Sequence, residues 1–262
     1  MRRLVLSVVT AISLPLTACA TMETGDPLAR EAAASSLAAA VASPGRPEAA
    51  RALDESRKPV ETLRFLGLKP GMVAADLLTG TGYWAEIMGH VVGPKGEVVA
   101  YQPEQFYTDD KSKAAWADLA ARSPAVREVR YPFDAFAPPA RSLDFALVNL
   151  SYHDLYWTSE QYKIPPTDPD AYLRGLYAAM RPGGVVGVID HVGKGTDTRA
   201  LVDKLHRIDP AVVRADFERA GFRLAGESDL LANPADDHTI NVFDPAIRGR
   251  TDRFLYKFVK PR

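Results

Sequence analysis

Apolar and polar residues succeed one another along the chain in blocks that predict strands separated by helices. Short, almost continuous apolar runs predict strands at 73–78, 97–101, 125–130, 143–150 and 185–190. Helical segments fit between several of them, at 83–92, 111–121 and 169–180. Strands that are apolar on both faces and alternate with helices are typical of a parallel sheet covered by helices on both sides.

The two ends of this region complete the predicted sheet. Residues 48–66 have a helical pattern, and Pro59 is expected to begin a second helix within it. Toward the C-terminus, residues 211–220 are predicted to be helical and 222–230 extended, and alternation over 253–259 predicts an antiparallel strand. We therefore expect an α/β fold: a doubly wound, mostly parallel, seven-stranded Rossmann-like sheet whose last strand is antiparallel.

The N-terminus has the pattern of an export signal. Arg2 and Arg3 precede an apolar run over 4–16, which is shorter than the ~20 residues that a membrane-spanning helix needs and fits a signal peptide instead. Leu16-Thr17-Ala18-Cys19 then resembles the bacterial lipoprotein cleavage box, in which the cysteine becomes the lipidated first residue. Ala20, rather than Asp, implies by the same resemblance a periplasmic protein anchored to the outer membrane.

The alternative is an ordinary signal peptide cut after Ala18, with Cys19 incidental. Cys19 is the only cysteine, so an internal disulfide is excluded. We expect a signal peptide over 1–18, a lipidated tether rich in Ala, Ser, Gly and Pro over 19–47, and one folded domain over 48–262. The net charge of -1, from 32 basic and 33 acidic residues, argues against a nucleic-acid partner.

The segment with the most chemical information lies between the first predicted strand and the helix after it. It reads Asp76-Leu77-Leu78-Thr79-Gly80-Thr81-Gly82. Glycines at such a position let the backbone approach a ligand closely, and the N-terminus of the next helix faces the same crevice. A tight strand-to-helix turn would use the same glycines, so this motif alone does not decide for a nucleotide-like ligand.

Further motifs follow in a characteristic order. They are Lys69-Pro70-Gly71, Gly93-Pro94-Lys95-Gly96, Leu143-Asp144-Phe145 and Arg181-Pro182-Gly183-Gly184. The series resembles the class I S-adenosylmethionine-dependent methyltransferases over about residues 59–192. Within that superfamily the chain is most similar to a bacterial group of predicted methyltransferases, through Asp54-x-x-Arg57-x-Pro59, Tyr152-His153-Asp154 and His206-Arg207-Ile208-Asp209.

The resemblance implies S-adenosylmethionine as cofactor and assigns residues to it. Asp76, Gly80 and Gly82 would border its methionine part, and Asn149 would lie over the sulfonium. Asp134 stands where an acidic residue often meets the adenine amine, although a turn or helix-capping role suits it equally.

Two positions depart from the pattern of these methyltransferases. The first glycine of the usual motif is Leu78 here, and the acidic residue that binds the ribose hydroxyls is missing from the end of the second strand. Gln102 and Glu104 occupy that region and are the candidates for contacting the ribose.

A polar group follows the fourth and fifth predicted strands. His153, Asp154 and His191 are the candidate catalytic residues, because a histidine near neutrality can take a proton from a methyl acceptor. Hydrogen-bonded structural histidines are the alternative. A metal site that also used His206 would lack a compact spacing such as His-x-x-x-His, so we predict no metal ion.

The sequence is compatible with three functions. The first is a methyltransferase that acts on a small molecule or an envelope component. The second is a non-catalytic lipoprotein that keeps the crevice for another ligand, which the two departures favour. The third is a metal-assisted hydrolase built on the histidine and aspartate group.

Overall fold

The computed structural model describes residues 36–262, and the predicted strands form one mixed sheet in the order β3-β2-β1-β4-β5-β7-β6. The strands are β1 (Val73–Leu77), β2 (Glu97–Pro103), β3 (Val126–Tyr131), β4 (Leu143–Asn149), β5 (Met180–His191), β6 (Arg223–Ser228) and β7 (Arg253–Val259). β7 is antiparallel to both of its neighbours, and the pairs from β3 to β5 are parallel. The predicted fold class is therefore confirmed.

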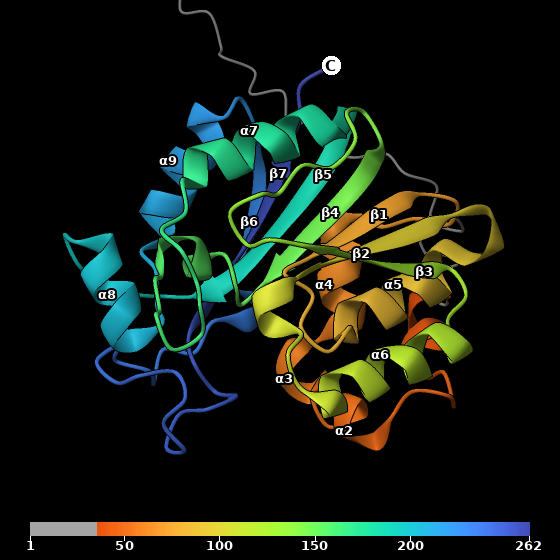
Figure 1. Cartoon of the computed structure of the whole chain (residues 1–262), viewed down its shortest axis with the longest axis horizontal. Coiled ribbons are helices and arrows are strands. Elements are labelled where there is room, and N and C mark those ends of the chain that lie inside the picture. Colours follow the sequence, from red (N-terminus) through yellow and green to blue (C-terminus); the bar gives the residue numbers. More distant parts are fainter. Residues whose placement is uncertain (1–35) are drawn as a thin grey trace, which may run out of the picture.

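Helices cover both faces of this sheet (Figure 1). They are α2 (Glu48–Arg51), α3 (Asp54–Arg57), α4 (Pro59–Leu66), α5 (Tyr83–Val92), α6 (Asp110–Arg122), α7 (Pro169–Ala179), α8 (Thr198–Leu205) and α9 (Pro210–Arg219). Buried side chains of α7 and α9 share one apolar core with the sheet, and those of α4, α5 and α6 share the other. None of the helices within the described part of the chain is long and apolar enough to cross a membrane.

The strand order creates a crevice at the carboxyl end of β1. β1 pairs with β2 on one side and with β4 on the other. The chain leaves β1 toward β2 and β3, then returns to add β4 and β5 on the opposite side. The loops after β1 and β4 therefore diverge, and this switch point is where doubly wound sheets bind ligands.

The folded domain begins earlier in the chain than the sequence predicts. Residues 36–41 are helical, and Leu37 and Ala40 are buried in the core beneath α4 and α5. The Arg46 guanidinium is also buried and forms two hydrogen bonds of 2.7 and 2.8 Å to the Asp54 carboxylate. A solvated tether would leave these side chains exposed, so residues 36–47, which were expected to belong to the tether, are part of the folded domain. The signal peptide and Cys19 lie outside the described residues.

Candidate cofactor cleft and histidine cluster

A cleft of about 180 Å³ lies at the switch point. Its lining comes from the ends of β1 and β4, the start of α5 and one residue of α3: Arg57, Asp76, Leu77, Leu78, Thr79, Gly80, Thr81, Tyr83, Trp84, Asn149, Leu150 and Ser151. Three predicted cofactor residues, Asp76, Gly80 and Asn149, are thus brought together here.

Asp76 is the buried acid of the cleft. Its Oδ2 accepts hydrogen bonds from the Thr79 hydroxyl and from the Ala85 backbone N–H, at 2.5 and 3.0 Å. Burial raises the pKa of the Asp76 carboxyl from 3.8 to about 7, against the opposing effect of these hydrogen bonds. A carboxylate held in this way is stabilised by a cationic ligand that enters the cleft.

The loop after β1 keeps a glycine-like backbone although its first glycine is replaced. Leu78 has φ 53°, in the left-handed region that costs an ordinary residue about 1–2 kcal/mol. Its side chain is only 6% exposed and belongs to the core shared with α7 and α9, while the residue still borders the cleft. Leucine at position 78 therefore adopts the left-handed backbone that a glycine would adopt there.

The two remaining glycines serve different purposes. Gly80 has φ 60°, and no atom lies within 4 Å of the position of a Cβ there, so it faces open space. Gly82 has φ 78°, and a Cβ would lie 2.5 Å from the Leu119 side chain of α6. Gly82 thus permits α6 to pack over the start of α5, whereas Gly80 leaves room for a ligand.

Arg57 is a cleft residue that the sequence analysis did not select. Its guanidinium lies 4.3 Å from the centre of the Tyr83 ring, and the Tyr83 hydroxyl donates a 2.7 Å hydrogen bond to Asp54. Burial lowers the pKa of Arg57 from its ordinary value, while Tyr83, Asp76 and Asp54 oppose this effect. The Asp54-x-x-Arg57-x-Pro59 element was the signal for it, but its position over the cleft follows only from the fold.

The residues predicted for the nucleoside part lie outside the lining. The Gln102 side chain is buried, and its Oε1 accepts a 3.1 Å hydrogen bond from the Gly80 N–H. Gln102 therefore supports the loop instead of facing the cleft. Glu104 and Asp134 are exposed, and their contacts with a cofactor remain predictions.

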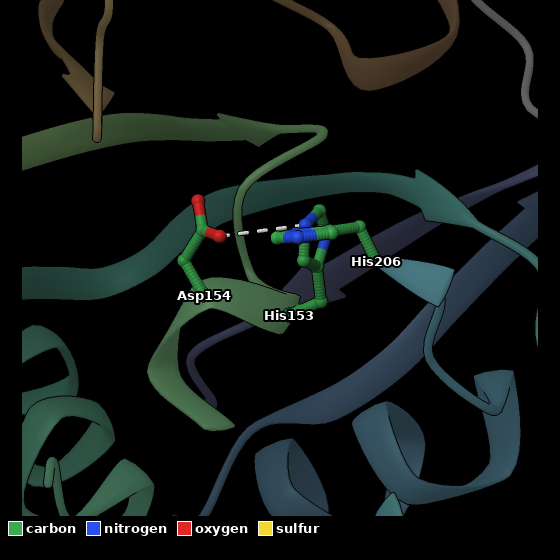
Figure 2. A group of neighbouring side chains, drawn as sticks. All are labelled: His153, Asp154 and His206. Atoms are coloured by element: carbon green, nitrogen blue, oxygen red, sulfur yellow. Dashed lines mark ion pairs between the residues drawn. The ribbon is translucent and has the colours of Figure 1, made fainter. Parts of the chain in front are cut away.

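A second polar centre follows β4 directly. His153 opens the short η3 helix (His153–Tyr156), and its Nδ1 lies 2.8 Å from Oδ1 of Asp190 at the end of β5. Its Nε2 lies 3.4 Å from Oδ1 of Asp154. Figure 2 shows that His206, after α8, points its ring toward these two side chains. One ligand atom from each of His153, Asp154 and His206 lies within 4.8 Å of the others.

His191 lies outside this group of three, and its catalytic role stays a prediction. Its Nδ1 lies 2.7 Å from the Thr251 hydroxyl, and its ring centre is 6.0 Å from that of His153. Burial lowers the pKa of His191 to about 3. His206 occupies the place beside His153 instead, and its position in the chain gave no spacing signal.

The charges around His153 favour its protonated form. Burial lowers the pKa of His153, but Asp190 and Asp154 outweigh this effect and raise it to about 9. These carboxylates favour the protonated imidazole, so His153 would have to lose its Nε2 proton before it could act as a base or bind a metal ion. Burial lowers the pKa of His206 to about 4, which leaves that ring neutral.

Solved structures share this arrangement of helices and strands. A SAM-dependent methyltransferase from Aquifex aeolicus superposes with a TM-score of 0.55 at 18% identity, over 79% of this chain and 98% of that one. The 1,6-didemethyltoxoflavin-N1-methyltransferase of Burkholderia thailandensis, solved with S-adenosylhomocysteine, superposes with a TM-score of 0.50 at 17% identity, over 90% and 88%. The chain has the fold of the S-adenosylmethionine-dependent methyltransferases.

Sequence comparison gives a partial likeness to one kind of methyltransferase. Over 131 residues the chain is 28% identical to the ubiquinone/menaquinone biosynthesis C-methyltransferase UbiE of Shewanella sp. (strain ANA-3). The match covers 49% of this chain and 46% of that protein, so the chain spans about half the length of its curated relatives. No family model matches the chain.

Proposed function

We propose that the protein is an S-adenosylmethionine-dependent methyltransferase. The observation that supports this most directly is the pair of opposite charges in the cleft, Arg57 and Asp76. The amino-acid end of S-adenosylmethionine carries one carboxylate and one ammonium group. A guanidinium binds a carboxylate through charge-assisted hydrogen bonds, and a buried carboxylate favours an ammonium group.

Other features of the cleft fit the same ligand. Gly80 leaves its wall open, and Asn149 lies at the end of β4 beside it. When bound, S-adenosylmethionine supplies a methyl group activated by its sulfonium. The protein would hold the amino-acid end with Arg57 and Asp76 and orient the methyl group toward the acceptor.

The acceptor in this proposal is a small molecule or an envelope component. The partial likeness to UbiE, a methyltransferase of quinone biosynthesis by its name, supports transfer to carbon of an apolar acceptor. The signal peptide and Cys19 would place the enzyme at the periplasmic face of the outer membrane, anchored by lipid, where it could meet an envelope acceptor.

Calorimetric titration of S-adenosylmethionine and S-adenosylhomocysteine into the full chain tests the proposal. We expect both to bind, and Arg57→Met to weaken binding by about 10- to 100-fold, as the loss of a charge-assisted carboxylate contact would. Arg64→Met is the matched control, because Arg64 is exposed on α4. Arg64→Met should bind S-adenosylmethionine with the same affinity as the wild type.

Transfer itself is measured with S-adenosylmethionine labelled in its methyl group and incubated with an envelope fraction. Labelled product should form with the wild type and Arg64→Met and fall with Arg57→Met. Absence of binding by a folded protein would overturn the proposal. Tight binding without transfer to any fraction would favour the non-catalytic alternative, which Leu78 and the engaged side chain of Gln102 support.

A further inference from the structure

We propose that His153, Asp154 and His206 form a binding site for one divalent transition-metal ion, of the borderline kind represented by Zn²⁺. Two imidazole nitrogens and one carboxylate oxygen are the donors that such ions prefer. Figure 2 shows the three side chains directed at a common point, although they come from two distant segments of the chain.

The spacing of the ligand atoms suits an ion of this size. Ligands bonded at about 2.0–2.2 Å around one ion lie roughly 3.0–3.5 Å apart. Nε2 of His153 and Oδ1 of Asp154 are already 3.4 Å apart. The whole set lies within 4.8 Å, so the ligand atoms must approach one another by about 1 Å to bind an ion.

Asp190 provides the support that a metal-bound histidine usually has. Its carboxylate is fully buried and is fixed by the backbone N–H groups of His153 and His191, at 2.9 and 2.8 Å. The same carboxylate accepts the hydrogen bond from Nδ1 of His153. This contact orients the ring and leaves Nε2 directed toward Asp154, as in the carboxylate–histidine–metal arrangement of known sites.

His206 is held in place at a cost to the backbone. It has φ 50° and ψ 47°, a left-handed conformation in which glycine would be less strained. Its ring lies edge-on between Trp157 and Phe243, with ring centres 5.0 Å away in both cases. The next residue, Arg207, is buried and bonded to both carboxylate oxygens of Asp236. Binding of a ligand by the imidazole ring would explain why this strained position holds a histidine and not a glycine.

Three protein ligands leave at least one coordination position open, which is typical of catalytic rather than structural sites. Ser151 borders the cofactor cleft and lies two residues before His153. If the proposed function holds, the ion would bind an oxygen or nitrogen atom of the acceptor and lower its pKa next to the activated methyl group. That consequence rests on the proposed function, whereas the metal site itself does not.

The test uses the full chain, produced without a histidine tag and freed of metal by chelation. Zn²⁺ is titrated calorimetrically, and Co²⁺ is added separately because its visible spectrum reports the number and kind of its ligands. We expect one equivalent to bind. His206→Gly should weaken Zn²⁺ binding at least 100-fold, and Asp190→Asn by about 10- to 100-fold.

The variants are chosen so that unfolding does not imitate loss of the site. Glycine relieves the backbone at position 206, so His206→Gly should remain folded. His238→Gly is the matched control: His238 also has a positive φ, 66°, and its Nε2 lies 2.8 Å from a carboxylate oxygen of Asp252, outside the cluster. It should bind Zn²⁺ like the wild type.

Equal Zn²⁺ affinity in the wild type and His206→Gly would overturn the proposal, as would the absence of saturable binding by the wild type. Titration of S-adenosylmethionine into metal-free protein is a separate measurement. Its failure would count against the proposed function alone and leave the metal result unaffected.

Discussion

At the scale of single residues, several groups beside the cleft and the histidine cluster have a conformation or a charge that is unfavourable in isolation. Asp76 is a buried acid, and Leu78 and His206 have left-handed backbones. Such features lower stability and persist where the surrounding structure fixes them, and they gather at functional sites. Asp76 and Leu78 lie at the end of β1 and His206 follows α8, so each of the three stands beside a candidate site.

Protonation of Asp76 should make the free energy of unfolding depend on pH. Its folded pKa of about 7 lies above the ordinary value of 3.8, so between these pH values the folded state binds more protons than the unfolded state. The contribution of Asp76 to the free energy of unfolding therefore falls as pH rises, by on the order of 1 kcal/mol per pH unit.

Asp76→Asn removes this effect while keeping a side-chain oxygen for Thr79 and Ala85. Its urea midpoint should exceed that of the wild type at pH 8 and approach it at pH 4, and its affinity for S-adenosylmethionine should be lower. Asp118→Asn, an exposed position on α6, should follow the wild type at both pH values. An Asp76→Asn variant that is less stable at pH 8 would contradict the prediction.

The strained backbone of Leu78 is testable against its neighbour. Leu77 and Leu78 belong to the same core and are 1% and 6% exposed, so replacement of either by glycine loses about 2–5 kcal/mol of packing. Only Leu78→Gly recovers about 1–2 kcal/mol from its left-handed backbone. Leu77→Gly should thus have the lower free energy of unfolding in urea. The reverse order would mean that the Leu78 backbone is not strained.

How far the site could be predicted from sequence also depends on particular residues. The motif from Asp76 to Gly82 located the cleft because strand, turn and helix are adjacent in the chain. Arg57 and His206 reach their sites from elements that are distant in sequence, and no local spacing reveals this. Gln102 was expected to contact the ribose. Its side-chain oxygen instead accepts a hydrogen bond from the Gly80 N–H, and only the packed structure reveals this partner.

At the scale of elements, the segment from residue 36 to α3 is what places Arg57 over the cleft. Arg46 bonds Asp54, Asp54 accepts from the Tyr83 hydroxyl, and Tyr83 begins α5. Arg253 of β7 donates a 2.7 Å hydrogen bond to the Ser56 carbonyl, which ties the other end of α3 to the sheet. The segment is therefore part of the site and not a spacer.

Removal of the buried Arg46 guanidinium should lower the free energy of unfolding. Arg46→Met leaves Asp54 without its main partner; because the Asp54 side chain is 24% exposed and keeps the Tyr83 hydroxyl, we expect a cost of about 1–3 kcal/mol. The free energy of unfolding in urea should fall by an amount of that order, and affinity for S-adenosylmethionine should fall with it because Arg57 loses its support. Arg51→Met, at an exposed position in α2, should change neither quantity.

Most elements could be predicted because their patterns are local. The bounds expected for α5 and β7 agree with the structure, and the strands other than β5 differ by one or two residues. β5 is longer than expected because Met180 already pairs with Leu143 of β4, after which the register shifts. Gly183 and Gly184 lie in this shift and exchange backbone hydrogen bonds with Lys260, just after β7. The tether was expected over 19–47 because alanine-rich sequence does not reveal which alanines are buried.

At the scale of the whole molecule, one edge of the sheet carries all of the proposed chemistry. The cleft uses the ends of β1 and β4, and the histidine cluster uses the loop after β4 with Asp190 from the end of β5. Parallel strands place their carboxyl ends at one edge, so a cofactor and a metal-bound acceptor would approach each other without any movement of domains.

Lipidation of Cys19 would hold this edge of the sheet near a membrane. If Cys19 is lipidated, the 16 residues between it and residue 36 can span at most roughly 55 Å, so the cleft would remain within reach of membrane-held acceptors. In a Gram-negative host the wild type should fractionate with the outer membrane and require detergent for release. Cys19→Ser should appear in the soluble periplasmic fraction with its affinity for S-adenosylmethionine unchanged, because the residues that line the cleft all lie between positions 57 and 151. A wild-type protein that is soluble without detergent would instead support the ordinary signal peptide cut after Ala18, and the acceptor would then be sought among soluble metabolites.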